Sequence, residues 1–222
     1  MTVRAATLVL FAQRVACGGV LCCVGACGSN RPELPPGLGA PESCVSVDYP
    51  LGPYGTEPGS VLQNACFQGL RTPARAASEG ALEPMALSDY YDPDGTRGVR
   101  LLLVNTAALW CSACRIEHET LPATARALAP RGLVVVSALF EDSNRNPADF
   151  DDLSVWVESF DTNFPILLDP SYSFGLYASA ETAPLNLVID PRNMIILKKI
   201  IGDQPAVLWP YVEAELLRRG AP

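Results

Sequence analysis

Between residues 100 and 201 the apolar positions fall into short continuous runs, each about as long as a β-strand. Runs without polar interruption are typical of central strands that are covered on both faces. Arg100–Asn105 and Leu133–Phe140 are the clearest of them. The pattern predicts six strands, at Val61–Phe67, Arg100–Asn105, Leu133–Phe140, Pro165–Leu168, Pro184–Asp190 and Met194–Ile201.

Between these runs, apolar positions recur with the spacing of amphipathic helices. The spacing predicts helices at Arg115–Ala129, Ala148–Phe160 and Ala206–Arg219. The buried face of the first helix is expected to consist of Ile116, Leu121, Ala125 and Leu128. Strands that alternate with helices, followed by a hairpin and a last helix, predict an α/β fold with a mixed central sheet and helices on both faces.

The first 59 residues differ in composition from the rest of the chain. Residues 1–26 contain two arginines and no acidic residue, and they end in an uncharged apolar stretch, as secretory signals do. Residues 27–59 are rich in proline and glycine, which exclude regular elements and favour a tether with an irregular cap. The expected organisation is a signal peptide at 1–26, a tether and cap at 27–59, and a folded domain at 60–222.

The signal ends in Val24-Gly25-Ala26-Cys27, which resembles the lipobox of bacterial lipoproteins. The resemblance implies that Cys27 becomes the lipidated first residue, and Gly28 beside it favours the outer membrane. The alternative is a transmembrane helix over Ala5–Ala26, which would place Arg14 near the bilayer centre at a cost of about 2.5–3.5 kcal/mol. The lipoprotein interpretation predicts an exported, periplasm-facing domain that is anchored to the membrane by lipid.

The overall charge argues against one class of partner. The chain has 16 basic and 24 acidic residues, which give a formal net charge of −8. Nucleic-acid binding depends on a basic surface that meets the phosphate backbone. We therefore expect no nucleic-acid partner.

The chain has eight cysteines, of which three lie in the predicted signal and one, Cys27, is the predicted lipidation site. The other four are Cys44, Cys66, Cys111 and Cys114, an even number in an exported chain. If Cys111 pairs with Cys114, the candidates for a structural disulfide are Cys44 and Cys66, which enclose a stretch with little core of its own. The alternative is that Cys66 is simply a small buried apolar residue.

Cys111 and Cys114 stand directly after a buried strand and at the start of a helix. The N–H groups of a helix N-terminus stabilise a thiolate and lower the pKa of the first cysteine. The second sulfur can then reach back and resolve a mixed disulfide. Cys111 is the predicted nucleophile and Cys114 the resolving thiol, with Trp110 shielding one side of the pair.

A metal site is the alternative for this pair. Structural zinc needs about four ligands, and the chain has no second pair of this kind. Its single histidine, His118, lies four residues beyond Cys114. We expect His118 to face solvent, with a place near the sulfurs as the alternative, and we expect no metal.

The run VNTAALWCSACRIE, from Val104 to Glu117, resembles the membrane-tethered thiol–disulfide oxidoreductases of the TlpA/ResA group in the redoxin superfamily. The resemblance covers about residues 60–219. It implies a thioredoxin-like three-layer α/β fold, in which a central mixed sheet is flanked by helices. It also implies an N-terminal extension, and the insertion of the TlpA and peroxiredoxin branches at about Phe164–Tyr177. The only redox group that it implies is a disulfide between the two cysteines, with no separate cofactor.

The same resemblance assigns roles to residues around the cysteines. Glu117 stands where the group carries an acidic residue that handles protons, and it shares a helix face with Cys114. The alternative is an ordinary glutamate in the first turn of a helix. Asn105 matches the TlpA-type pattern, where thioredoxin has a buried aspartate. Pro184 stands where the family has a cis-proline beside the cysteines, which leaves the backbone of Ala183 free to pair with a substrate chain.

The leading interpretation is an extracytoplasmic, membrane-anchored thiol–disulfide oxidoreductase that reduces disulfides in partner proteins and draws electrons from a thiol carrier in the membrane. The direction of electron flow rests on the TlpA/ResA resemblance alone. A peroxidase of the AhpC/TSA type is one alternative, but its motif has a proline before the cysteine, and residues 106–110 contain none. A copper-binding module of the SCO type is another, but it uses a Cys-x-x-x-Cys pair and a distant histidine.

Overall fold

The computed structural model describes residues 48–73 and 82–220, all within the unit that spans 34–222. The predicted signal peptide, Cys27 and most of the tether lie outside the described residues. Cys44 does as well, so the predicted Cys44–Cys66 disulfide also lies outside them. None of the helices in the described ranges is both long and apolar enough to span a bilayer.

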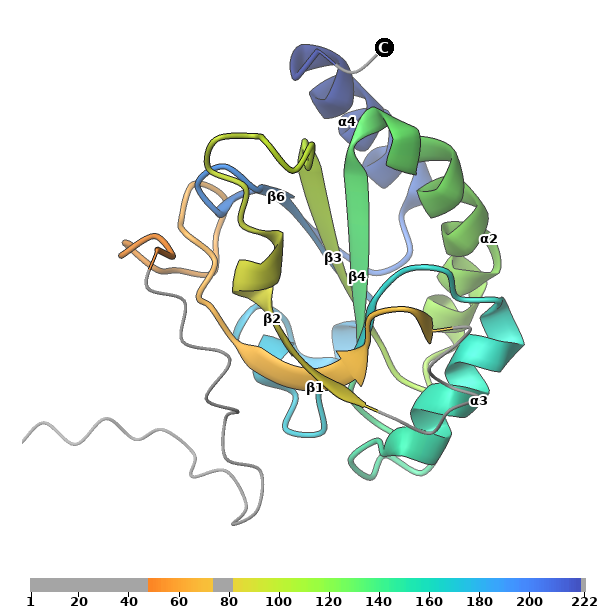
Figure 1. Ribbon diagram of the computed structural model, residues 1–222. Helices are drawn as coiled ribbons and strands as arrows, with labels where there is room; N and C mark the ends of the chain where they lie inside the picture. The colour runs from red at the N-terminus through yellow and green to blue at the C-terminus, as the bar shows by residue number, and fades with distance from the viewer. Residues whose placement is uncertain (1–47, 74–81, 221–222) are drawn as a thin grey trace, which may run out of the picture. The chain divides into compact units, whose positions relative to one another are not determined.

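A seven-stranded mixed sheet forms the centre of the domain, in the order β2-β1-β5-β4-β3-β6-β7 (Figure 1). Neighbouring strands are parallel from β3 through β4 to β5 and antiparallel in the rest of the sheet. The strands are β1 (Cys66–Leu70), β2 (Glu83–Ala86), β3 (Leu101–Ala107), β4 (Leu133–Leu139), β5 (Ile166–Leu168), β6 (Leu185–Asp190) and β7 (Ile195–Ile201). The α-helices are α2 (Ser112–Leu128), α3 (Phe150–Phe160) and α4 (Pro205–Arg218). The 3₁₀ helices are η2 (Leu87–Tyr90), η3 (Ala129–Arg131), η4 (Ser173–Leu176) and η5 (Ala180–Thr182).

The predicted strands from residue 100 onward are confirmed. Before residue 100, the strands of the structure differ from the single predicted one. The strand expected at Val61–Phe67 begins only at Cys66, and Val61 forms isolated bridges with Tyr54 and Ile195 instead. Strand β2 was not predicted, because it starts with a glutamate and a proline and lies at the edge of the sheet, where a proline is tolerated.

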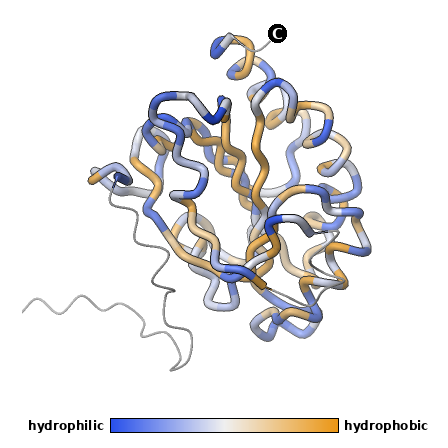
Figure 2. The backbone as a smooth tube through the Cα atoms, in the orientation of Figure 1, coloured by the Kyte–Doolittle hydropathy of each residue, from blue (hydrophilic) through white to orange (hydrophobic). Residues whose placement is uncertain are grey.

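Side chains alternate between the two faces of the sheet along each strand. On β3, Leu101 and Leu103 pack against α2 and α4. Leu102 and Val104 point to the opposite face, which is covered by Tyr49 and by residues of η2 and η4. The predicted mixed sheet with helices on both faces is therefore confirmed, although the helices on the second face are short 3₁₀ turns. Figure 2 shows the apolar positions concentrated on the central strands.

The buried face of α2 differs from the predicted one at its N-terminal end. Ile116 is 56% exposed, so the prediction that it belongs to the core is wrong. Two polar residues, Glu117 and His118, are buried in its place, one helical turn before Leu121. The second turn of α2 therefore presents polar side chains to the sheet, and the later turns present Leu121, Ala125 and Leu128.

This assignment of the α2 faces predicts unequal effects of two truncations. We expect Leu121→Ala to lower the free energy of unfolding by about 2–5 kcal/mol, because it removes fully buried methyl groups and leaves a cavity. Ile116→Ala, on the exposed side of the same helix, should change it by no more than about 0.5 kcal/mol. Urea denaturation of both variants measures this, and equal losses would contradict the assignment.

Candidate active site

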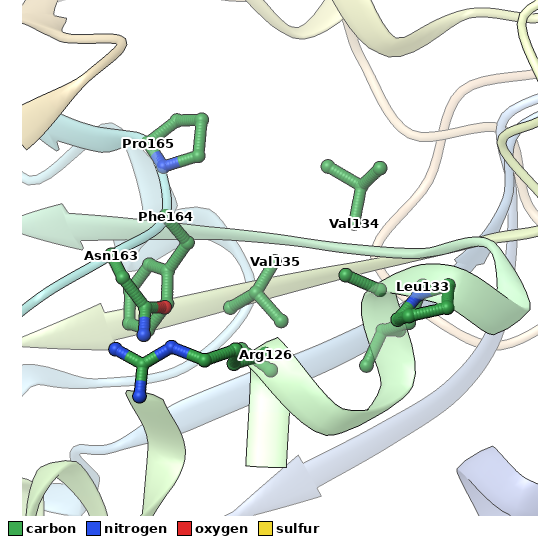
Figure 3. Close-up of a pocket in the computed structure, with 10 residues that line it drawn as sticks. Arg126, Leu133, Val134, Val135, Asn163, Phe164 and Pro165 are labelled. Carbon is green, nitrogen blue, oxygen red and sulfur yellow. The ribbon is translucent and has the colours of Figure 1, made fainter. Parts of the chain in front are cut away.

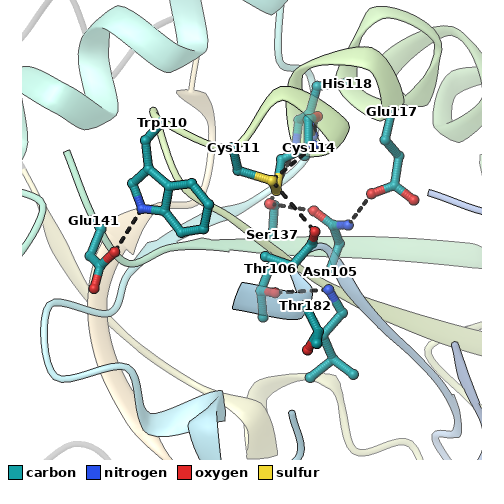
Figure 4. The surroundings of a disulfide bond; sticks show 12 residues. Asn105, Thr106, Trp110, Cys111, Cys114, Glu117, His118, Ser137, Glu141 and Thr182 are labelled. Carbon is teal, nitrogen blue, oxygen red and sulfur yellow. Dashed lines mark hydrogen bonds between the residues drawn. A yellow bond between two sulfur atoms is a disulfide. The ribbon is translucent and has the colours of Figure 1, made fainter. Parts of the chain in front are cut away.

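The two cysteines meet at the point where β3 leads into α2, and they form a disulfide (Figure 4). The Sγ–Sγ distance is 2.06 Å and the Cα atoms are 5.3 Å apart. Cys111 caps the N-terminus of α2, and the Cys114 N–H donates to its Sγ at 3.0 Å. Cys111 is 3% exposed and Cys114 is fully buried. Once the disulfide is reduced, a thiolate at Cys111 would therefore receive both an N–H group and the positive end of the helix dipole.

The segment before β6 lies against the first sulfur. The peptide bond between Ala183 and Pro184 is cis, as the resemblance implies. The carbonyl oxygen of Ala183 is 3.6 Å from Cys111 Sγ. The N–H of Ala183, however, donates to the carbonyl of Ala180 at 3.1 Å, which closes η5. The carbonyl therefore faces the disulfide, whereas the N–H is already used within the chain.

Trp110 lies to one side of the disulfide, as expected (Figure 4). Its indole Nε1–H donates to Glu141 Oε2 at 2.6 Å, and its ring packs edge-on against Phe140. The guanidinium carbon of Arg145 is 3.9 Å from the centre of the ring, a cation–π contact. The loop after β4 thus holds the tryptophan at both its edge and its face.

Behind the cysteines, three polar side chains lie on one rung of the sheet. In the strand register, Asn105 of β3 is paired with Ser137 of β4 on one side and with Asn186 of β6 on the other. All three are fully buried. Ser137 Oγ donates to Asn105 Oδ1 at 2.9 Å, and Asn105 Nδ2 donates to Asn186 Oδ1 at 3.1 Å. The rung thus links the three strands beneath the first turn of α2.

Glu117 reaches this rung from α2. One carboxylate oxygen accepts from Asn105 Nδ2 and the other from Asn186 Nδ2, both at 2.7 Å. Burial raises the pKa of Glu117 to about 7, and the negative charge of Asp203 acts in the same direction, whereas the two amide donors act to lower it. The alternative of an ordinary surface glutamate is wrong, because Glu117 is only 6% exposed. A group with this pKa can gain and lose a proton near neutral pH.

His118 was expected to face solvent, and this expectation is wrong, because the residue is fully buried. Its Nδ1 lies 3.0 Å from the carbonyl oxygen of Cys114, and its Nε2 lies 3.3 Å from Ser137 Oγ. The rings of Trp156 and Phe160 of α3 pack on it, with centroid distances of 4.9 and 5.8 Å. Burial lowers the pKa of His118 to about 4, so the imidazole is neutral at physiological pH.

The described residues also form an open, largely apolar groove away from the disulfide. It lies between the C-terminal end of α2, the start of β4 and the segment before β5 (Figure 3). Arg126, Phe164 and Pro165 are among its lining residues, which include none of the predicted site residues. Within residues 48–73 and 82–220, no group of three or more histidine, cysteine or acidic side chains is placed to hold a metal ion.

Comparison with known proteins finds curated relatives over about half of the chain. No known family model matches the chain. It is 29% identical over 108 residues to the thiol:disulfide interchange protein DsbE of Pseudomonas fluorescens biotype C, and 30% identical over 109 residues to the protein of the same name from Tatumella citrea. These alignments cover 48% and 49% of this chain and 54% and 53% of the relatives. The chain therefore spans about half the length of the curated relatives that it matches.

Solved structures support the architecture. The domain superposes on a protein from Chlorobium tepidum with a TM-score of 0.55 and 18% identity, over 74% of this chain and 99% of that one. It also superposes on the thioredoxin domain of a thiol-disulfide oxidoreductase from Bacteroides vulgatus, with a TM-score of 0.51 and 19% identity, over 72% and 98% of the two chains. The chain has a thioredoxin-like fold. The predicted α/β fold class, a mixed sheet flanked by helices, is thereby confirmed, and the segment predicted as an insertion at about Phe164–Tyr177 contains β5 and η4.

Two residues of the buried network, Ser137 and Asn186, were not predicted. Ser137 is the single polar residue of β4, and Asn186 lies between apolar residues in β6. That signal was present in the sequence, since an unpaired polar group is costly to bury and usually has a partner. The identity of the partner depends on the strand register, which the pattern of one strand does not give.

The raised pKa of Glu117 predicts how the stability of the domain depends on pH. Between the ordinary value of 4.5 and about 7, the folded protein keeps a proton that the unfolded chain has lost. Stability should therefore fall as pH rises through this range, by at most about 1.4 kcal/mol per pH unit, and show no further change from this group above it. Glu117→Gln should lack this component. Urea denaturation of both proteins at several pH values measures the difference, and parallel profiles would contradict the prediction.

Proposed function

We propose that the protein is a thiol–disulfide oxidoreductase whose reacting groups are Cys111 and Cys114. The observation that carries this proposal is the disulfide at the N-terminus of α2, in which the Cys114 N–H donates to Cys111 Sγ at 3.0 Å. The similarity to two DsbE proteins supports it. The Ala183 carbonyl 3.6 Å from the Cys111 sulfur supports a place for substrate on this side of the pair.

The exchange proceeds in two balanced steps. In the reduced protein, the Cys111 thiolate attacks one sulfur of a substrate disulfide, forms a mixed disulfide and releases the other substrate sulfur as a thiolate. The Cys114 thiolate then attacks Cys111 Sγ, which closes the internal disulfide and releases the second substrate thiolate. Two electrons pass from the protein to the substrate, and each released thiolate takes up a proton from its surroundings.

Glu117 supplies the proton acceptor for the second step. Cys114 is buried and must lose its proton before it can attack. Glu117 lies one helical turn further along α2, and its ionised carboxylate is held by two amide donors. A carboxyl group with a pKa of about 7 accepts a proton from a thiol and later returns it to solvent.

The direction of electron flow, the partner proteins and the cellular location are inferred from the TlpA/ResA resemblance and the lipobox. The domain reduces disulfides in partner proteins, and a thiol carrier in the membrane returns it to the dithiol state by the same exchange run in reverse. Cys27 carries the lipid anchor that holds the domain outside the cytoplasm, with the outer membrane favoured by Gly28.

Substitution of each cysteine tests the assigned roles. Cys111→Ser should reduce insulin-type disulfide reduction to the background rate, because it removes the nucleophile. Cys114→Ser should accumulate a mixed disulfide with the substrate, because the resolving thiol is lost. The double variant Cys44→Ser/Cys66→Ser is the matched control and should keep the activity. Full activity in Cys111→Ser would overturn the proposal, and peroxide consumption at a comparable rate would favour a peroxidase instead.

The anchor is tested separately by mass spectrometry of the protein from a membrane fraction. We expect the mature chain to begin at Cys27 with a diacylglycerol mass on that residue, and Cys27→Ser to leave the chain uncleaved and unlipidated. An unmodified Cys27 in the membrane fraction would contradict the lipid anchor and leave the redox assignment unaffected.

A further inference from the structure

A continuous series of four contacts joins the backbone of Cys114 to the carboxyl group of Glu117. The carbonyl oxygen of Cys114 is 3.0 Å from His118 Nδ1, and His118 Nε2 is 3.3 Å from Ser137 Oγ. Ser137 Oγ is 2.9 Å from Asn105 Oδ1, and Asn105 Nδ2 is 2.7 Å from Glu117 Oε2. The series crosses from α2 to β4 and β3 and returns to α2, and every residue in it is buried.

When Glu117 is ionised, the hydrogens of this series are too few to satisfy all four contacts. A neutral imidazole has one N–H, and a serine hydroxyl has one hydrogen. When Asn105 turns its Nδ2 toward Glu117, the Ser137 hydroxyl donates to Asn105 Oδ1, so the 3.3 Å contact between Ser137 Oγ and His118 Nε2 is satisfied only by the Nε2–H tautomer. His118 Nδ1 is left without a hydrogen, facing the carbonyl oxygen of Cys114. This arrangement suits an ionised Glu117, which needs donors.

The opposite arrangement suits a protonated Glu117. The Glu117 hydroxyl donates to Asn105 Oδ1 after the amide turns over, and Asn105 Nδ2 donates to Ser137 Oγ. Ser137 then donates to His118 Nε2, so the imidazole hydrogen is on Nδ1 and donates to the carbonyl of Cys114. The contact without a hydrogen is now the one between Asn105 and Asn186, outside the series, because the turned amide places Asn105 Oδ1 where Nδ2 lies 3.1 Å from Asn186 Oδ1.

Counting the four contacts of the series and the Asn105–Asn186 contact, each arrangement leaves one contact without a hydrogen, so the proton on Glu117 can decide between them. We propose that His118 and Ser137 are positioning residues that set the direction of the Asn105 amide, and that the His118 tautomer changes when Glu117 gains or loses its proton. The use of this tautomer change in catalysis rests on the proposed function. When Glu117 takes the proton of Cys114, the carbonyl oxygen of Cys114 accepts a hydrogen bond from His118 Nδ1–H.

The surroundings of His118 limit which other groups can act on it. Trp156, Phe160 and Phe164 pack around the ring, and Arg115 lies on the Phe160 ring with its guanidinium carbon 5.5 Å from the centroid. The charged group that acts on Glu117 from outside the network is Asp203, before α4. Neither Arg115 nor Asp203 has a hydrogen bond to His118 in the described part of the chain, so the tautomer depends on the series itself.

Nitrogen NMR of the oxidised protein tests the proposal directly. His118 is the single histidine, so an untagged, ¹⁵N-labelled sample gives one pair of imidazole nitrogen signals, whose shifts report the tautomer. Over a titration from about pH 5.5 to about pH 8.5, which brackets the usual range of a raised carboxyl, we expect a change from Nδ1–H to Nε2–H. Its midpoint should equal that of the Glu117 carboxyl ¹³C signal.

Two variants show whether the His118 tautomer is coupled to the Glu117 proton or whether His118 and Ser137 are only structural. Glu117→Gln should abolish the change, because it removes the titrating group. Ser137→Ala should leave the Glu117 titration in place but uncouple the tautomer from it, because the link between them is lost. The exposed Ser143→Ala is the matched control and should behave as the unmodified protein.

The proposal is overturned if the tautomer stays constant across the titration, or if it still follows Glu117 in Ser137→Ala. If Ser137→Ala does not fold, the comparison of the unmodified protein with Glu117→Gln still decides. The measurement needs no substrate and no turnover. Its failure would leave thiol–disulfide exchange intact, and loss of exchange activity would not alter the NMR result.

Discussion

The burial of the Glu117 carboxyl group is the constraint around which the site is organised. A carboxyl removed from water must either stay protonated or receive strong donors, and here burial and two amide donors oppose each other. The donors come from Asn105 and Asn186, which lie side by side only because β3 and β6 pair in one particular register. A shift of one residue would turn Asn186 to the other face of the sheet. The sheet therefore fixes the proton chemistry as much as the helix that carries the cysteines does.

The two ends of the site depend on different kinds of structure. The surroundings of the Cys111 sulfur depend on local geometry, because Cys111 caps a helix and the Cys114 N–H reaches its sulfur within three residues of sequence. The surroundings of the Glu117 carboxyl depend on long-range pairing, since Asn105 and Asn186 are 81 residues apart in the chain. A buried polar network of this kind stabilises the fold less than apolar packing would. Its presence inside a well-packed sheet is consistent with a functional role.

The sequence was informative wherever the signal was local. The continuous apolar runs identified β3 and β4, and the spacing of the two cysteines identified the start of α2. The prediction for Ile116 failed because an apolar residue was assigned to the core, whereas the core positions of that turn hold Glu117 and His118. Ser137 and Asn186 were not predicted, because their role arises from pairing between distant strands. Such pairing depends on the whole fold and not on any one segment.

The placement of the polar rung has a consequence for protein engineering. The four residues from Cys111 to Cys114 could be grafted onto the corresponding loop of another thioredoxin-like scaffold, and the helix N-terminus there would still activate the first sulfur. Glu117 would not move with them, because it lies outside those four residues and its two amide donors belong to separate strands, β3 and β6. Beside a transplanted cysteine pair, the group that accepts the proton would be one supplied by the recipient scaffold. The polar groups of the recipient sheet would then set the proton affinity beside the cysteines, and redesign would have to begin there.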